Sequence, residues 1–291
     1  MKGRLTIFDL DKLGIITDEV SSSLVDALEW AKCHGLRHVE IRTIDGVNAI
    51  DLSDSHLRWI REQVNQSGLF VSCLASPVFK CPLSPSRPVQ RGDMFGDQED
   101  TVDGHFEKLQ RSIDIAHMLG TRRIRIFSFW RERDPRAFYD EIVSHLREAA
   151  RVAEERNILL LLENEPSCNG GFAAEVGEFV HAVASPALKV LWDPGNEAYG
   201  GRSSFPEGYR AIKEVVAHVH LKDVRHCANG KPVCVPIGSG EIPFIDHFTA
   251  LQEDGYAGLY TIETHFMPDG GTLADGSSAS LAGLKMMVHG E

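Results

Sequence analysis

The chain has 291 residues, of which 43% are hydrophobic and 25% charged, and these proportions are typical of a globular protein. Its formal net charge of -12 weighs against a function that depends on contacts with nucleic-acid phosphates. No apolar run approaches the roughly 20 residues of a membrane-spanning helix, and two acids interrupt the start of the chain, where a secretory signal needs an apolar stretch. We therefore expect a cytoplasmic protein with no nucleic-acid or membrane partner.

Eight apolar segments rich in β-branched residues have the length and composition of strands. In chain order they are residues 13–17, 38–44, 69–76, 123–129, 158–165, 188–193, 218–223 and 259–265. Helical periodicity lies between them, and several of the helical segments end in glycine, which readily adopts the left-handed conformation that terminates a helix. The expected helices are residues 21–35, 53–68, 105–120, 135–156, 177–185, 206–217 and 243–255.

Strands that alternate with helices favour a parallel sheet, because parallel strands need long crossover connections. Eight such units in a chain of this length predict the α/β class and a closed (β/α)8 TIM barrel. A doubly wound open sheet is the alternative, but its usual G-x-G-x-x-G after the first strand is absent, since that strand leads into TDEVSSSL. No linker divides the chain, and residues 1–291 are expected to form one domain.

The connection after the third expected strand is unusually long. It covers residues 77–100 and contains four prolines. Loops of this length in compact domains commonly act as lids or binding loops, and an ordinary surface loop is the alternative. Lys80, Arg87 and Arg91 in this loop leave room for an acidic or phosphorylated substrate, although no motif is decisive for phosphate.

Four consecutive expected strands in the C-terminal half end in residues able to bind a metal. LLLENEP contains Glu163, VLWDPGN contains Asp193, HVHLKDV contains His220 and YTIETH contains Glu263. Alternate residues of a barrel strand face the interior, and all four candidates lie near the strand ends where barrel active sites form. Three carboxylates and one imidazole suit one divalent cation, with Mn²⁺ favoured and Mg²⁺, Co²⁺ or Zn²⁺ as alternatives. The alternative interpretation is that these four are ordinary polar residues at strand ends, which form hydrogen bonds with loop amides.

These motifs resemble those of a known family. HVEIR is similar to the family's second strand, which ends in a glutamate, and LENEP, WDPGN, HVHLKD, GSGEIPF and TIETH are similar to its later motifs, in the same order. On these residues the chain resembles, over essentially its whole length, the xylose isomerase-like TIM barrels of the sugar-phosphate isomerase/epimerase superfamily. This group includes ketose 3-epimerases, inosose dehydratase and hydroxypyruvate isomerase. The motif set is specific to the superfamily and not to one reaction.

The resemblance implies a role for each of the four strand-end residues. Glu163, Asp193, His220 and Glu263 would hold the metal, and Glu163 and Glu263 would also be the acid and base on either side of the bound sugar. Removal of a proton beside a carbonyl gives an enediolate, which a metal stabilises as a Lewis acid, and return of the proton completes isomerisation or epimerisation. The expected substrate is a small sugar, keto-sugar or sugar phosphate. The family commonly forms dimers or tetramers, which implies a homo-oligomer.

Seven further residues are candidates for substrate binding: Glu40, Trp130, Glu165, Asn196, Lys222, Arg225 and His265. Glu40 could bind sugar hydroxyls or an adjacent metal-ligand group, and an ion pair with Arg42 is the alternative. Solvated loop charges are the alternative for Lys222 and Arg225. Asn196 departs from the family, several of whose members have a histidine at this point.

Two other features carry weaker signals. Gly238 and Gly240 in PIGSGEIP fit an anion-binding turn ahead of a helix, although a tight turn alone gives the same spacing. The six cysteines form no C-x-x-C pair, which indicates reduced, packed thiols and no structural zinc.

Three other functions are compatible with parts of the sequence. A metal-dependent lyase that dehydrates a keto-inositol or keto-sugar begins with the same proton abstraction and differs in the loss of water. A nuclease similar to endonuclease IV needs many histidine ligands and a grip on phosphates, which does not suit this acidic chain. A binding protein that has lost its catalysis is opposed by the intact set of four strand-end residues.

Overall fold

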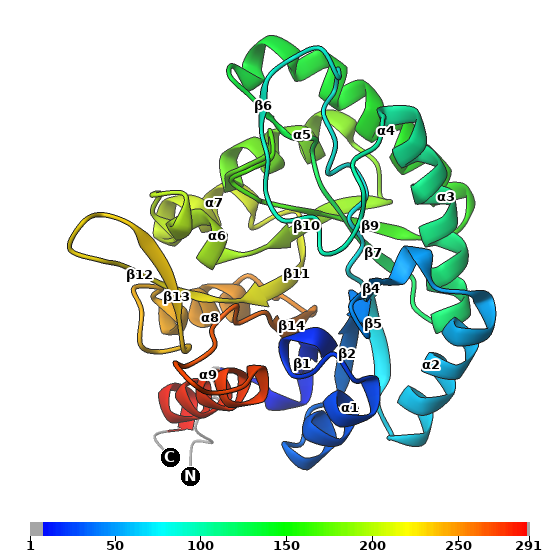
Figure 1. Ribbon diagram of the computed structural model, residues 1–291. Helices are drawn as coiled ribbons and strands as arrows, with labels where there is room; N and C mark the ends of the chain where they lie inside the picture. The colour runs from blue at the N-terminus through cyan, green and yellow to red at the C-terminus, as the bar shows by residue number, and fades with distance from the viewer. Residues whose placement is uncertain (1–7, 290–291) are drawn as a thin grey trace.

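Eight parallel strands close into a barrel, as the alternating pattern predicts (Figure 1). The computed structural model describes residues 8–289. In spatial order round the barrel the strands are β1 (Leu13–Ile16), β14 (Leu259–Ile262), β11 (Val216–Leu221), β10 (Leu188–Trp192), β9 (Leu159–Glu163), β7 (Arg123–Ile126), β5 (Phe70–Leu74) and β2 (His38–Ile41). Because β1 pairs with β14 on one side and β2 on the other, the sheet has no edge, and the doubly wound alternative is excluded.

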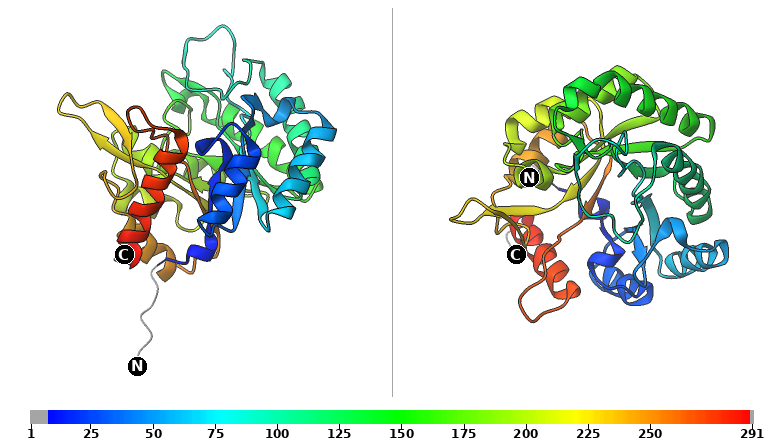
Figure 2. Two further views of the ribbon diagram at one scale, coloured as in Figure 1. Left: turned by 60° about the horizontal axis from the view of Figure 1, so that its bottom comes forward. Right: turned by 45° about the horizontal axis from the view of Figure 1, so that its top comes forward.

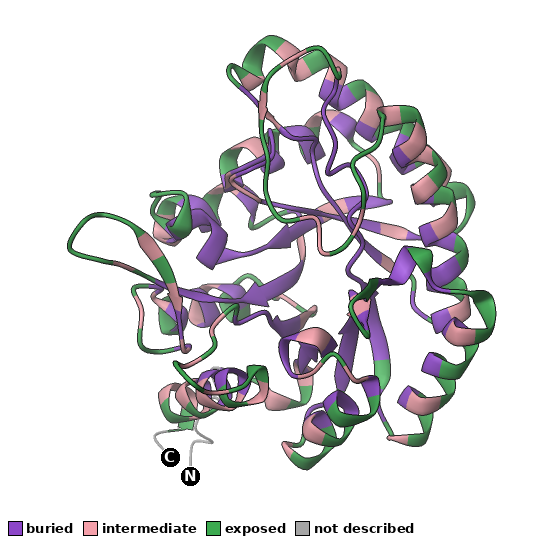
Figure 3. Ribbon diagram, in the orientation of Figure 1, coloured by how far each residue is buried: buried purple, intermediate pink, exposed green. Residues whose placement is uncertain are grey.

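Helices surround the barrel and cover its outer face. They are α1 (Leu24–Cys33), α2 (Asp54–Gln66), α3 (Val102–Leu119), α4 (Tyr139–Glu155), α5 (Ala173–Val183), α6 (Pro194–Tyr199), α7 (Tyr209–Ile212), α8 (Phe244–Glu253) and α9 (Leu273–His289). Figure 3 shows buried strands inside a ring of helices whose outer faces are exposed. In α2, for example, Leu57, Ile60 and Val64 are at most 1% exposed at helical spacing, which anchors one face of the helix on the barrel.

Local sequence signals set the bounds of α3. The side chain of Thr101 accepts a hydrogen bond from the N–H of Gly104 at its start, and Gly120 follows its last residue with a φ of 81°. This left-handed conformation is readily available to glycine, so the helix end expected at this residue is confirmed.

Some expected helices have different bounds in the structure. Residues 135–156 begin with a 3-10 turn, Pro135–Phe138, before α4 starts. Most of residues 206–217 is not α-helical, because a π-helical turn at Ser204–Gly208 leads into the four-residue α7 and the last two residues already belong to β11. The run VVAHVH is rich in valine, which favours a strand there. No expectation covered α6, α9 or the three small two-stranded sheets.

The connecting segments that follow the strands gather at one end of the barrel. Figure 2 shows the long loop after β5 and the hairpin of β12 (Asp223–His226) and β13 (Pro232–Val235) at this end. Within the long loop, β6 (Val89–Gln90) pairs with β8 (Arg131–Glu132), so the loop is fixed to the connection after β7. A second hairpin, of β3 (Thr43–Ile44) and β4 (Val47–Asn48), follows β2.

The barrel interior changes from apolar to charged towards the carboxyl ends of the strands. A small apolar cluster inside the barrel is separate from the core between strands and helices, and consists of Cys73, Leu161 and Leu191. Glu163 and Asp193 lie two residues further along the chain than two members of this cluster. Val190 and Trp192 instead pack in the outer core, as the alternation in this strand predicts.

No helix within residues 8–289 combines the length and the apolar character needed to cross a membrane. All six cysteines are free thiols. Three of them are buried, namely Cys73, Cys81 and Cys168.

Candidate active site

Four side chains meet at the carboxyl end of the barrel, from four strands that are consecutive in the sheet. Glu163 ends β9, Asp193 follows β10, His220 lies in β11 and Glu263 follows β14. One nitrogen or oxygen atom of each lies within 4.8 Å of the corresponding atom of the other three. None of the four is more than 2% exposed. The structure therefore brings together the four residues that the strand ends singled out, and we call them the quartet.

The two glutamates of the quartet share two partners. His220 Nδ1 lies 3.3 Å from Glu163 Oε1 and 3.2 Å from Glu263 Oε2. Arg125 Nη1, on β7, lies 3.3 Å from Glu163 Oε2 and 3.3 Å from Glu263 Oε1. Because β10 and β11 separate the two strands that carry the glutamates, the carboxylates reach this point from different sides of the barrel.

Two more basic side chains contact the carboxylates of the site. Lys222 Nζ lies 2.7 Å from Asp193 Oδ2 and 3.2 Å from Glu263 Oε2. Arg42 follows β2, and its Nη1 lies 2.8 Å from Glu263 Oε1 while its Nη2 lies 2.7 Å from Glu19 Oε1. Each of these buried cations faces acids on two elements, which offsets the loss of hydration on both sides of the ion pairs.

A further layer of hydrogen bonds lies beneath the quartet and holds His220. Glu40 Oε2 lies 3.3 Å from His220 Nε2, and Glu40 Oε1 lies 2.6 Å from both His218 Nε2 and Thr261 Oγ1. A carboxylate on the second ring nitrogen fixes the orientation of an imidazole. Glu40 is fully buried and pairs with these histidines, so the alternative of an ion pair with Arg42 is wrong. Glu40 contacts His220, a candidate metal ligand, and does not line the pocket at the barrel mouth.

Electrostatic interactions favour the charged form of both glutamates. Burial alone raises the pKa of Glu263, but cationic neighbours, Lys222 first among them, outweigh burial and hold this pKa well below its usual value. Burial likewise raises the pKa of Glu163, and Arg125 more than offsets it, so the pKa is lowered. At Asp193 burial dominates, and the pKa is raised despite the contact with Lys222.

The donor atoms of the quartet suit a hard divalent cation. Glu163 Oε1 and Asp193 Oδ2 are buried and accept no hydrogen bond of good geometry from residues 8–289, although ion-pair partners lie beside both. Acids outnumber bases in the surrounding cluster of ion pairs. The acids are Asp18, Glu19, Glu40, Glu163, Asp193 and Glu263, and the bases besides histidine are Arg42, Arg125 and Lys222. A divalent cation offsets such an excess of buried negative charge, so the residues present fit a metal site.

A pocket of about 500 Å³ adjoins the quartet. One wall comes from the loop of residues 77–100 and the other from the strand ends and their connections. Four of the expected substrate-binding residues line it, namely Glu165, Asn196, Lys222 and His265. Asn196 Nδ2 donates to the backbone oxygen of Asn164 at 2.9 Å, and His265 Nε2 lies 3.5 Å from Glu263 Oε1, so both have partners at the edge of the quartet.

Trp130 and Arg225 do not line this pocket. Trp130 is fully buried and packs with Phe127 and Cys168, as a core residue does. Arg225 is exposed on the β12–β13 hairpin, where it pairs with Val233 across the two strands. The hairpin begins directly after Lys222 and carries the chain away from the barrel mouth.

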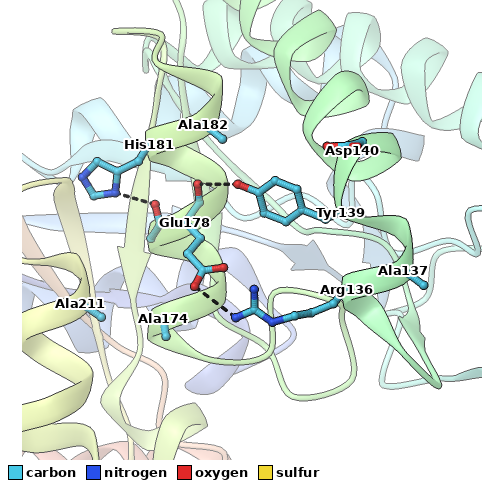
Figure 4. Close-up of a pocket in the computed structure, with 10 residues that line it drawn as sticks. Arg136, Ala137, Tyr139, Asp140, Ala174, Glu178, His181, Ala182 and Ala211 are labelled. Carbon is cyan, nitrogen blue, oxygen red and sulfur yellow. Dashed lines mark hydrogen bonds and ion pairs between the residues drawn. The ribbon is translucent and has the colours of Figure 1, made fainter.

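A larger pocket, of about 1000 Å³, lies on the outside of the molecule between α4 and α5 (Figure 4). Its polar groups already have partners nearby. Arg136 pairs with Glu178 at 3.2 Å, and His181 Nδ1 lies 2.7 Å from the backbone oxygen of Gly177. Neither the quartet nor a side chain in contact with it lines this pocket. Lys222 and His265, which contact the quartet, line the smaller pocket at the barrel mouth, so we assign the site to that pocket.

The turn at Gly238 and Gly240 binds the side-chain carboxylate of Asp223. The Asp223 carboxylate accepts hydrogen bonds from the N–H groups of Gly238 at 2.8 Å and Gly240 at 2.9 Å, and also from Val224 and Ile242. The turn therefore ties the start of the β12–β13 hairpin to the connection before α8. Its amide groups are not free for a substrate phosphate, which corrects that expectation.

Sequence reasoning missed three residues that shape the site. Arg42 and Arg125 supply its buried positive charge, and both stand in alternating strands where inward positions recur every second residue. Asn164 clasps the backbone next to the quartet: its Oδ1 accepts from the N–H of Asp193 at 2.9 Å, and its Nδ2 donates to the oxygen of Asp193 at 2.9 Å. The alternation of the strands is the signal that could have identified the two arginines. No sequence pattern predicts the hydrogen bonds between Asn164 and the backbone of Asp193.

The fold and the site together define a (β/α)8 barrel with an acidic, histidine-containing centre at the carboxyl ends of its strands. The profile of the family described as "Xylose isomerase-like TIM barrel" matches residues 28–286. The chain belongs to this family, and the resemblance carried by its motifs is confirmed.

Relatives of known name are sugar epimerases. The chain is similar to L-ribulose-5-phosphate 3-epimerase UlaE of Escherichia coli, with 27% identity over 248 residues that cover 82% of this chain and 81% of that protein. The crystal structure of the IOLI protein with a zinc atom shares the fold at a TM-score of 0.73 and 19% identity, and covers 95% of this chain and 98% of that one. D-psicose 3-epimerase, crystallised in the presence of D-fructose, gives a TM-score of 0.69 at 18% identity, over 96% of this chain and 100% of that one.

Proposed function

We propose that this protein is a divalent-metal-dependent isomerase or epimerase of a small sugar, keto-sugar or sugar phosphate. The observation that carries the proposal is the approach of Glu163 and Glu263 to the same two partners, His220 and Arg125. Two buried carboxylates that reach one point from different strands are suited to take a proton from one face of a carbon and return a proton to the other. The name of the relative UlaE, a 3-epimerase, supports the same reaction class.

In this proposal Glu163 and Glu263 are the catalytic residues. The carboxylate on one face of the substrate takes the proton beside the carbonyl, which leaves an enediolate. The glutamate on the other face, which has first taken up a proton from solvent, gives that proton to the carbon, and the first glutamate releases its proton to solvent at the end of the cycle. Arg125 contacts both and is a positioning residue, since its single Nη1 lies 3.3 Å from each. The lowered pKa of each glutamate favours the ionised form, which the glutamate that acts as the base needs near neutral pH.

The quartet is the proposed metal-ligand set. Glu40 orients His220 within it, and Asn164 fixes the backbone of Asp193. When bound, a divalent cation supplies Lewis acidity at the substrate carbonyl. Mn²⁺ is the first choice because carboxylate oxygens predominate among the donors, and Zn²⁺ is the second because the similar IOLI structure contains it.

The loop of residues 77–100 is the proposed lid of the same domain. Asp93 and Phe95 from this loop line the pocket opposite the strand ends. A loop in this position limits the access of water to the substrate and so protects an enediolate from side reactions.

A panel of ketoses, inososes and their phosphates, incubated with the protein and Mn²⁺, tests the proposal. An isomerase or epimerase gives a product of unchanged mass and altered carbonyl position or chirality. A product lighter by one water assigns the site to a lyase instead. Conversion is expected to stop when a chelator removes the metal and to return when metal is added back. Conversion that persists after complete removal of metal would contradict the metal dependence.

A further inference from the structure

Among the lysine and arginine side chains of residues 8–289, four are buried, and one of these lacks an acidic partner. They are Arg42, Lys80, Arg125 and Lys222. Arg42, Arg125 and Lys222 form ion pairs with acids of the site. Lys80 forms no ion pair with any carboxylate of the described residues. A buried ammonium without a counter-ion is strongly unfavourable, so this arrangement requires an explanation.

The surroundings of Lys80 stabilise its charge only in part. Lys80 is 1% exposed, and its Nζ donates one hydrogen bond, of 2.8 Å, to the backbone oxygen of Asp93. Nζ also lies 4.8 Å from the ring centre of Phe95, 4.4 Å from that of Phe127 and 5.8 Å from that of Trp130. The ring faces attract the cation. An ammonium has three N–H groups, however, and only one of those on Lys80 has an acceptor within the described part of the chain.

Lys80 lines the same pocket as the proposed reaction centre. The pocket of about 500 Å³ has Lys222 and His265 on the side of the quartet, and Lys80 with Asp93 on the side of the long loop. Lys222 is in direct contact with Asp193. A volume of this size accommodates a small sugar derivative, so one substrate can lie with its carbonyl at the quartet and its other end at Lys80.

We propose that Lys80 binds an anionic group of the substrate, a phosphate or a carboxylate, at the end remote from the reacting carbon. This inference rests on the proposed function for the position of the reacting end. An oxyanion supplies both the counter-charge and the acceptors that Lys80 lacks. The other cations of the loop are already paired: Arg87 Nε lies 2.8 Å from Glu132 Oε1, and Arg91 Nε lies 2.8 Å from Glu99 Oε1.

The competing explanation is that Lys80 only holds the loop closed through Asp93 and the aromatic rings. The two explanations differ in how removal of the charge affects different ligands. Loss of an anion contact weakens binding of anionic ligands alone, whereas loss of loop order weakens binding of neutral and anionic ligands together.

The test is equilibrium binding, by calorimetry, of a ketopentose, its 5-phosphate and the matching sugar acid to the metal-loaded protein. The wild type is expected to bind one of the anionic ligands more tightly than the neutral sugar, and the preferred anion identifies phosphate or carboxylate. In Lys80→Met the affinity for that anion falls by about 10- to 100-fold, the loss of a charge-assisted hydrogen bond, while the affinity for the neutral sugar is maintained. Lys80→Gln provides the same test if Lys80→Met does not fold.

Arg91→Met is the matched control, because Arg91 lines the pocket but is paired with Glu99 and exposed. It is expected to change anion affinity by less than about fivefold. The proposal fails if the wild type prefers neither anion, or if both Lys80 variants keep the preference. Binding is measured apart from turnover, so the two proposals can fail separately. An anion preference that depends on Lys80 supports this inference even if the protein converts no ketose. Conversion of a ketose without such a preference supports only the proposed function.

Discussion

Glu163 and Glu263 lie against one nitrogen of Arg125, whose Nη1 is 3.3 Å from an oxygen of each. The arginine projects from β7, whereas the two glutamates come from β9 and from the end of β14. A single buried cation therefore holds two acids that would otherwise repel each other. The relationship links the stability of the barrel mouth to the geometry of the proposed reaction.

Replacement of Arg125 tests this link. In metal-free protein, Arg125→Met leaves two buried carboxylates with less counter-charge, and we expect the free energy of unfolding to fall by about 3–5 kcal/mol. Saturating Mn²⁺ should restore part of the loss, because the metal replaces the missing positive charge and binds the variant more tightly. Urea unfolding of both proteins, with chelator and with Mn²⁺, measures this. An equal loss of unfolding free energy with chelator and with Mn²⁺ would show that Arg125 does not interact with the metal site.

Substitution of either catalytic glutamate should remove turnover and leave the fold intact. Glu163→Gln and Glu263→Gln keep the size of the side chain but remove its basicity, so we expect kcat to fall by about 10²- to 10⁴-fold. Circular dichroism checks the fold. Glu178→Gln on α5 is the control, because this glutamate lies in the pocket between α4 and α5, away from the quartet, and it should keep wild-type turnover. Turnover near the wild-type level in either active-site variant would overturn its assignment.

Metal affinity should depend on both a ligand and its supporting carboxylate. His220→Ala removes one proposed ligand and is expected to weaken metal affinity more than the loss of its supporting carboxylate does. Glu40→Gln keeps His220 but weakens the contact of 3.3 Å to its Nε2, and we expect an affinity about 10- to 100-fold lower. Competition with a chromogenic chelator gives both constants. Unchanged affinity in His220→Ala would remove this residue from the ligand set.

One buried histidine outside the site should make the fold sensitive to acid. Burial lowers the pKa of His105 to about 3, and its Nδ1 accepts a hydrogen bond from the N–H of Phe79 at 2.8 Å. The folded state keeps this ring neutral, whereas the unfolded chain binds a proton below about pH 6.5, so the contribution of His105 is lost as the pH falls from about 6.5 towards 3. Between pH 7 and pH 5 this amounts to about 2 kcal/mol of unfolding free energy.

His105→Asn isolates this effect, because its side-chain oxygen can still accept from the N–H of Phe79 but does not titrate. The variant should lose less stability than the wild type between pH 7 and pH 5 in urea titrations. If the free energy of unfolding changes equally with pH in the two proteins, His105 does not titrate as described.

The barrel and the quartet were predictable from the sequence because both depend on local patterns. A strand alternates its side chains with a period of two, so the positions of Glu163 and Glu263 at the strand ends follow from the chain alone. The contacts of Arg125 do not follow, because alternation gives the direction of a side chain but not its partner on another strand. Lys80 is similar: its aromatic surroundings come from Phe95, Phe127 and Trp130, which only the folded loop brings together.

At residues 206–217 the sequence pattern predicts a helix that the structure mostly lacks. Its periodicity is helical, but Val216 near its end pairs with Val190 of β10, and the strand that begins there continues to pair with β14 from His218. These long-range contacts decide the structure. For Glu40 the alternation predicts a position inside the barrel, and the structure places it there against His220, a candidate metal ligand. Its depth beneath the quartet could not be predicted, because it depends on where the neighbouring strands end.

The central claim is that Glu163 and Glu263 exchange a proton with the carbon beside the substrate carbonyl. Nuclear magnetic resonance of a substrate converted by the metal-loaded protein in D₂O tests it most directly. The account predicts that solvent deuterium appears at that carbon in the product, and that neither Glu163→Gln nor Glu263→Gln gives efficient conversion. A converted product without deuterium at that carbon, at any stage of the reaction, would contradict it.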